Sequence, residues 1–64
     1  MSGAGLLLVL GRKSRGEPVT YEECRSLVAA GWARWSEEDA RFVITLAGST
    51  AYLSAPHAAV GYAR

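Results

Sequence analysis

The pattern of apolar and polar positions is clearest between residues 18 and 32, where it has the period of a helix. One side of that helix collects residues three and four positions apart: Tyr21, Cys24, Leu27, Val28 and Gly31. Polar and small residues occupy the other side, which we expect to face solvent or a partner. The pattern therefore predicts an amphipathic helix over residues 20–30, buried along the first set.

Both ends of this helix carry recognisable signals. Thr20 is a favoured N-cap residue, and Glu23 follows three positions later, where the two residues can form a reciprocal capping box. Gly31 can adopt the left-handed conformation that ends a helix, and Trp32 can then fold back over Leu27. We expect the rest of the chain to be organised around this helix.

A β-hairpin is predicted next, with strands at residues 32–35 and 41–45. In the second strand, Phe42 and Ile44 share one face, which is the two-residue period of a strand. The intervening segment, Ser36–Ala40, is a polar loop of hairpin length. If the first strand is regular, its two tryptophans lie on opposite faces, so that they cannot both enter one small core.

A short helix is predicted at about residues 46–54. Thr45 can cap it, and Leu46 and Leu53 keep a helical spacing. Pro56 then ends this helix or begins another turn. The tail that follows consists mostly of small residues, with Val60 and Tyr62 as candidate anchors.

The N-terminal segment is more ambiguous. Leu6–Leu10 has no polar position, so we expect it to be buried, and its five residues fit a short helix or a central strand. We favour a helix because leucine is a good helix former. Met1–Gly5 and the extreme C-terminus are expected to fray, and Gly11–Glu17 is predicted to be an exposed loop. Together these elements predict one small α+β domain over residues 1–64.

Composition and net charge exclude several classes of function for this chain. The net charge is only +1, and no stretch approaches the length of a membrane span. Cys24 is the single cysteine, so no internal disulfide can form, and a cytoplasmic location fits best. His57 is the only histidine, and no orienting acid lies near it in the sequence to complete a triad with Ser54. We therefore expect no enzyme activity, no cofactor and no metal site.

Residues 20–53 resemble the C-terminal half of a winged-helix domain. The resemblance lies in a helix that ends at Gly31, a charged hairpin, and the segment Ile44–Leu53, which fits the pattern apolar-Thr-x-x-Gly-x-x-x-x-Leu. The resemblance implies a compact winged-helix-like fold in which residues 20–30 form the recognition helix and the hairpin forms the wing. That family has two helices before the recognition helix, whereas residues 1–18 have room for one.

The charges on the hairpin argue against simple duplex binding. Its loop carries Glu37, Glu38 and Asp39, which the phosphates of DNA would repel. We therefore expect a non-catalytic module that binds a protein or nucleoprotein complex and inhibits a nucleic-acid-handling machine by occlusion. Small phage inhibitors of the anti-CRISPR type are similar in size and charge pattern. The candidate contacts are the three acidic residues, which could mimic phosphates, together with Arg34 and Trp35.

The alternative hypothesis is a small DNA-binding transcriptional regulator. Its candidate contacts are the basic residues of the first half of the chain: Arg12, Lys13, Arg15 and Arg25. A homodimer would double the number of phosphate contacts and could bury surplus apolar surface. A third hypothesis, an assembly subunit, shares the features of the protein-binding module.

Overall fold

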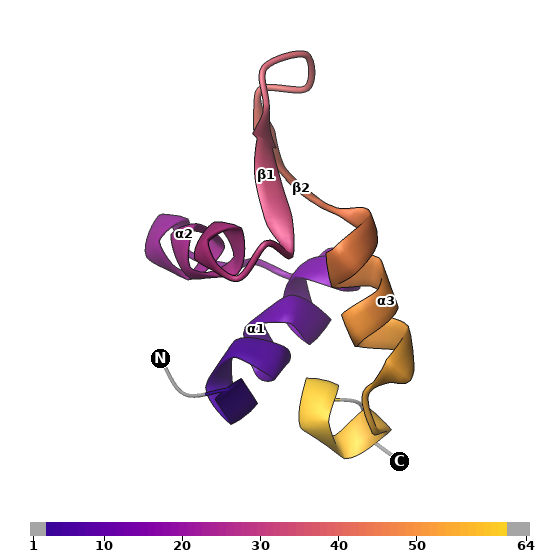
Figure 1. Cartoon of the computed structure of the whole chain (residues 1–64). Helices are drawn as coiled ribbons and strands as arrows, with labels where there is room; N and C mark the ends of the chain where they lie inside the picture. The colour runs from indigo at the N-terminus through magenta and orange to yellow at the C-terminus, as the bar shows by residue number, and fades with distance from the viewer. Residues whose placement is uncertain (1–2, 62–64) are drawn as a thin grey trace.

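The order of elements along the chain is helix, helix, hairpin, helix (Figure 1). The computed structural model describes residues 3–61. The elements are α1 (Gly3–Ser14), α2 (Tyr21–Ala29), β1 (Ala33–Ser36), β2 (Arg41–Ile44), α3 (Leu46–Ser54) and a 3₁₀ helix, η1 (His57–Val60). The predicted α+β class is confirmed, and each strand lies within one residue of its expected bounds.

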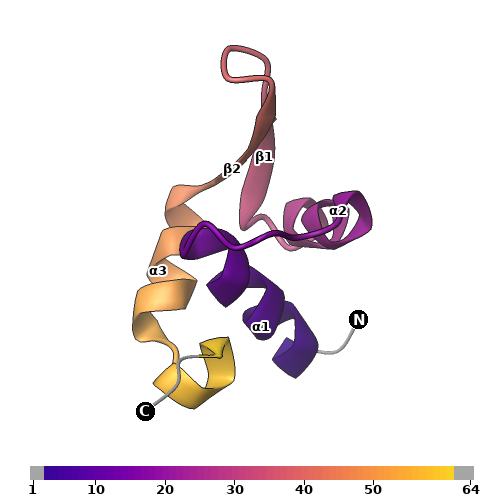
Figure 2. The same cartoon turned by 180° about the vertical axis from the view of Figure 1, so that it is seen from behind.

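Helix α1 lies at the centre of the domain. It packs against α2, α3 and η1, and both views show α2 on one side of α1 and α3 on the other (Figures 1 and 2). The buried core consists of Val9, Leu10, Leu27 and Ala33, with half-buried apolar side chains around it. The hairpin projects away from the helices and carries its turn at the far end (Figure 1).

Helix α2 has the predicted signals at both ends. The backbone N–H of Glu23 donates to the Thr20 hydroxyl over 3.0 Å, and the backbone N–H of Thr20 donates to the Glu23 carboxylate over 2.9 Å. At the other end Gly31 has a φ of 80°. Its N–H and that of Trp32 donate to the carbonyls of Val28 and Leu27, each over 2.9 Å. The capping box and the glycine stop are therefore confirmed.

The buried face of α2 is narrower than the pattern predicted. Cys24 and Leu27 are buried, but Tyr21 is 62% exposed and Val28 is 38% exposed. The prediction that these two residues face the core is therefore wrong. Because α2 has only nine residues and packs against α1 and β1, its core contact is limited to residues about one turn apart.

The N-terminal helix is longer than expected. The interpretation of Leu6–Leu10 as helix is confirmed, although Leu8 is 44% exposed. The predictions of a frayed N-terminus and of an exposed loop from Gly11 are wrong for Gly3–Gly5 and for residues 11–14, which are helical; residues 1 and 2 lie outside the described part. Gly11 is buried because the backbone of η1 approaches it closely, at Val60.

The hairpin pairs Ala33 with Ile44 and Trp35 with Phe42. Residues directly opposite each other share a face, so these four side chains lie on one side of the sheet. The other side carries Arg34, Ser36, Arg41 and Val43. As predicted, the two tryptophans are not buried together: Trp32 is half-buried against the core, whereas Trp35 is 50% exposed.

Thr45 caps α3, as predicted. Its hydroxyl accepts from the N–H of Gly48 over 3.1 Å and donates to the carbonyl of Gly31 over 2.7 Å, which ties α3 to the end of α2. The spacing of Leu46 and Leu53 marks the exposed side of α3, where these residues are 85% and 80% exposed. The helix instead presents Gly48 and its neighbours Ala51 and Tyr52 to the rest of the domain.

The C-terminal segment begins another turn at Pro56, which stands directly before η1. Val60 is 1% exposed, so its predicted role as an anchor is confirmed. The other candidate anchor, Tyr62, and the extreme C-terminus lie outside the described residues.

The capping box predicts how stability depends on pH. The hydrogen bond from the Thr20 backbone, followed by the bond from Arg12, lowers the pKa of Glu23 below its ordinary value of 4.5. The ionised carboxylate therefore stabilises the folded state above about pH 4.5, and this contribution disappears as the pH falls through the lower, folded-state pKa. We expect Glu23→Gln to lower the thermal unfolding midpoint at neutral pH and to leave it little changed in acid.

This pH dependence can be measured by circular dichroism melts between about pH 7 and about pH 3. Glu22→Gln is the matched control, because the neighbouring Glu22 side chain is exposed and makes no ion pair among residues 3–61. Equal losses for both substitutions at all pH values would contradict the assignment.

Candidate functional site

Three aromatic side chains from distant parts of the chain meet between α2 and the hairpin. The rings of Trp35 and Phe42 pack edge to face, with centroids 5.1 Å apart and an angle of 76° between the planes. Tyr21, at the first position of α2, reaches the same Phe42 with a centroid separation of 5.8 Å. Trp35 and Phe42 are directly opposite each other in the hairpin and so share a face, and the contact with Tyr21 shows that this face turns toward the start of α2.

These rings line a surface depression of about 410 Å³, together with Arg25. We call this depression the aromatic groove and define it by Tyr21, Arg25, Trp35 and Phe42. Half of the Trp35 surface remains in contact with solvent. Large aromatic side chains exposed in this way are typical anchors of protein interfaces, because burying them removes much apolar surface from water at little cost in side-chain entropy.

Arg25 supplies the positive charge of the aromatic groove. Its guanidinium carbon lies 5.7 Å from the centre of the Tyr21 ring, and its Nη1 donates to the Tyr21 hydroxyl over 3.3 Å. The two residues are four positions apart and so lie on the same side of α2. This contact orients the Tyr21 ring and leaves Arg25 exposed at the rim of the groove.

The predicted acidic residues lie at the outer end of the hairpin. Glu37, Glu38 and Asp39, which we call the acidic tip, are all exposed. Ser36 supports the turn: its hydroxyl accepts from the N–H of Asp39 over 3.1 Å and donates to the Asp39 carboxylate over 3.4 Å. The two glutamates make no ion pair within residues 3–61, so their charges are available to a partner.

The predicted protein-binding residues do not form one continuous surface. Trp35 faces the aromatic groove, whereas Arg34 lies on the opposite face of the hairpin, beside Val43. The acidic tip begins two residues after Trp35. The sequence interpretation did not include Tyr21 and Phe42 among the candidate contacts. The helical period placed Tyr21 on the side of α2 expected to be buried, and the strand period assigned Phe42 only to a face shared with Ile44.

Two of the four predicted nucleic-acid contacts, Arg12 and Arg15, form ion pairs within the molecule. Arg12 forms an ion pair with Glu23 over 2.6 Å. Arg15 pairs with Glu17 over 2.9 Å and donates to the carbonyl of Val60 over 2.7 Å. The hydrogen bond with Glu17 raises the pKa of Arg15 above its ordinary value. Arg12 therefore connects α1 to α2, and Arg15, which directly follows α1, connects to η1.

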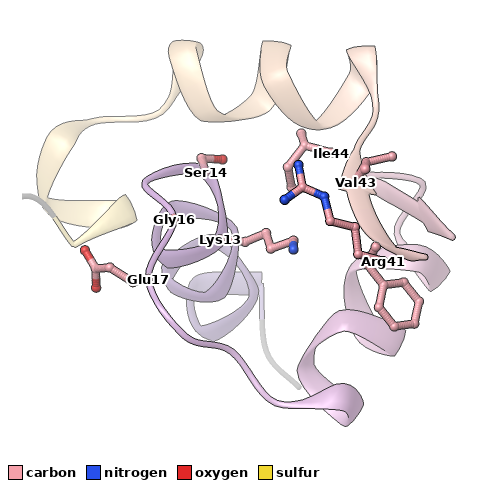
Figure 3. A pocket seen from close by; sticks show the side chains of 8 residues that line it. Lys13, Ser14, Gly16, Glu17, Arg41, Val43 and Ile44 are labelled. Atoms are coloured by element: carbon pink, nitrogen blue, oxygen red, sulfur yellow. The ribbon is translucent and has the colours of Figure 1, made fainter. Parts of the chain in front are cut away.

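Lys13 differs from these arginines in its surroundings. It lines a pocket of about 440 Å³ between the end of α1 and β2, and it extends toward Arg41 on the opposite wall (Figure 3). Neither cation has a carboxylate partner in the part of the chain that the structure describes. Arg41 was not among the predicted contacts, although the alternation along the second strand placed it opposite Phe42 and Ile44.

Few other side chains among the described residues are candidates for metal binding or catalysis. No group of three His, Cys, Asp or Glu side chains within residues 3–61 is placed to hold a metal ion. His57 is exposed at the start of η1, and Cys24 is a buried free thiol. None of the helices in this range has both the length and the apolar composition that a membrane span requires.

Comparison with protein-family models, curated protein sequences and solved structures found no match to this chain.

Proposed function

We propose that this chain is a non-catalytic protein-binding module whose partner docks on the aromatic groove. The observation that carries the proposal is the half-exposed Trp35, packed against Phe42 at one edge of an open depression. An indole held in place by its neighbours has lost most of its freedom before binding, so its burial by a partner contributes nearly its full hydrophobic free energy.

The acidic tip suggests the class of partner. Its carboxylates are exposed at the end of a projecting hairpin, a few residues from the groove. A protein that handles nucleic acid presents Arg and Lys side chains to phosphates, and the tip could pair with such a surface in their place. The module would then inhibit a nucleoprotein complex by occluding it, as expected from the similarity in size and charge to inhibitors of the anti-CRISPR type.

An affinity pull-down with the tagged protein tests this proposal, with the bound material analysed for both protein and nucleic acid. We expect a protein partner, and we expect Trp35→Ala to weaken its binding by about thirtyfold or more, the effect of removing an interface hot spot of about 2 kcal/mol. Replacing the three residues of the acidic tip by serine should weaken binding mainly at low salt, since exposed charges act over a short screening length.

Leu53→Ala is a suitable control, because Leu53 is also a large apolar residue and is more exposed than Trp35, but lies on α3, away from the groove. Equal losses of binding for Leu53→Ala and Trp35→Ala would contradict the assignment of the groove. Recovery of nucleic acid alone, with an affinity that falls steeply as salt increases, would favour the second candidate function.

That second candidate is a DNA-binding regulator of winged-helix type. It is supported by the order of the elements: α2 precedes the hairpin, and Tyr21, Arg25 and Val28 on this helix are exposed. The charges favour it less. The same helix exposes Glu22, and the hairpin ends in the acidic tip, so a duplex lying along both elements would meet more negative than positive charge.

A further inference from the structure

Strand β2 has a free edge. Within residues 3–61 the sheet has two strands, and β2 pairs with β1 alone. The pairing register also tells which backbone groups lie on that edge. The N–H of Thr45 donates to the carbonyl of Trp32 over 3.0 Å, and this pair continues the register of the hairpin by one step.

Hydrogen-bonded pairs alternate with non-bonded pairs along an antiparallel ladder. Because Trp32 and Thr45 form a bonded pair, the next bonded pairs are Arg34 with Val43 and Ser36 with Arg41. Phe42 and Ile44 occupy the non-bonded positions, so their N–H and C=O groups point away from β1. The free edge of β2 therefore presents the backbone donors and acceptors of these two residues.

A groove runs beside this edge. Its opposite wall is the end of α1 and the turn after it, and all four residues of β2 line it, giving a volume of about 440 Å³ (Figure 3). We call it the edge groove. Lys13 and Arg41 extend into it from opposite walls. The groove thus combines an unpaired strand edge with two cations.

No carboxylate neutralises these cations within the described residues. Glu17 also lines the groove, but it is held by Arg15 over 2.9 Å and points away from Lys13 and Arg41 (Figure 3). Two like charges that face each other across a groove favour an occupant that carries negative charge.

We propose that the edge groove binds an acidic, extended peptide segment of a partner protein, which adds a third strand to the sheet along β2. A peptide backbone offers both donors and acceptors, as the edge does, whereas a phosphate group only accepts. Carboxylates on the added strand, opposite Arg41 and within reach of Lys13, set the preferred sequence. This proposal goes beyond the aromatic groove and does not depend on Trp35.

The probe is a capped hexapeptide in which glutamate alternates with valine, followed by NMR of the ¹⁵N-labelled protein. In the free protein we expect fast amide hydrogen exchange at Phe42 and Ile44, and slower exchange at Val43. On binding, the amides of Phe42 and Ile44 should shift and become protected. Lys13→Gln combined with Arg41→Gln should weaken binding by about a hundredfold, about tenfold for each charged hydrogen bond lost.

Arg34→Gln is the matched control: it removes the same charge from the same face of the hairpin, but from β1, away from the free edge. It should leave the affinity within about twofold. Trp35→Ala should also retain the peptide. These variants separate the two proposals. Peptide binding in the edge groove can be disproved while capture of a partner through Trp35 is retained, and capture through Trp35 can be disproved while peptide binding is retained.

Two peptide variants test the mode of binding. Methylation of the backbone nitrogens on the pairing side keeps the charge but blocks the strand hydrogen bonds, and a lysine–valine hexapeptide reverses the charge. Binding of either variant as tightly as the glutamate peptide would overturn the proposal. It would also be overturned if inorganic phosphate or an oligonucleotide shifted these amides while the glutamate peptide did not. Absence of all binding would also overturn it, and Lys13 and Arg41 would then serve as charges that protect the strand edge from aggregation.

Discussion

A Gly11→Ala variant is expected to be much less stable than the native protein, by about 2 kcal/mol, the usual range for forcing extra atoms into a filled interior. A Cβ atom at Gly11 would lie well under 3.0 Å from the carbonyl oxygen of Val60, closer than real Cβ atoms come to other atoms. That oxygen also accepts a hydrogen bond from Arg15, so η1 cannot retreat without losing this contact and the burial of Val60.

Whether Gly11→Ala lowers or raises the stability of the protein distinguishes the effect of packing from that of helix propensity. Alanine is better than glycine inside a helix by about 1 kcal/mol, so propensity alone would make the variant more stable. Gly3→Ala is the control, since Gly3 is in the same helix and a Cβ atom there meets nothing within 4 Å. Urea unfolding followed by circular dichroism should show a loss for Gly11→Ala and none for Gly3→Ala. A gain for both would mean that η1 does not dock on α1.

Replacing Leu27 by alanine is expected to leave the chain largely unfolded at room temperature. Leu27 is 0% exposed and belongs to the small core formed with Val9, Leu10 and Ala33. Truncating a buried leucine costs about 2–5 kcal/mol. A chain of this size has a total stability of about 3–10 kcal/mol, from about 0.05–0.15 kcal/mol per residue. The loss is therefore comparable with the whole.

Val28→Ala is the control, because Val28 is the next residue of the same helix and is 38% exposed. We expect it to cost less than about 1 kcal/mol, as surface substitutions usually do. Thermal melts by circular dichroism compare the two variants. If Val28→Ala destabilised the protein as much as Leu27→Ala, the wider buried face predicted from the periodicity would be correct and the arrangement of α2 described above would be wrong.

The basic residues near the end of α1 show that a cluster of charges in the sequence does not reveal which side chains are available to a partner. In the sequence, Arg12, Lys13 and Arg15 look equivalent, and their clustering indicates a surface for nucleic acid. In the structure, partners 11 and 45 positions away engage Arg12 and Arg15, namely Glu23 and the carbonyl of Val60. Lys13 alone of the three lies in the groove with Arg41. The difference between Lys13 and the two arginines depends on contacts between residues far apart in the sequence, which the pattern of neighbouring residues does not show.

The aromatic groove also depends on contacts between residues that are distant in the sequence. Trp35 was predicted as a binding residue because surplus aromatics in a small chain must partly face solvent. Its neighbours Tyr21 and Phe42 were not. Tyr21 has the spacing of a buried residue in its helix, and the two-residue period places Phe42 on a face with Ile44 without showing what that face meets. They meet at the surface because α2 and the hairpin enclose a depression that the core does not fill.

The sequence by itself determined the elements whose causes are local. The capping box at Thr20, the glycine stop at Gly31 and the cap at Thr45 each involve residues a few positions apart, so their signals can be recognised within one short segment of the sequence. The two-residue period likewise identified the hairpin and the face that carries Phe42.

Only the tertiary structure decided which of these faces are buried. A helix or strand offers several directions for packing, and the choice depends on neighbours distant in the chain, which for α2 are α1 and β1. Burial at Leu27 and exposure at Tyr21 follow from that choice. The aromatic groove and the edge groove are surfaces left over when a small core is filled, and for that reason no single segment of the sequence encodes them.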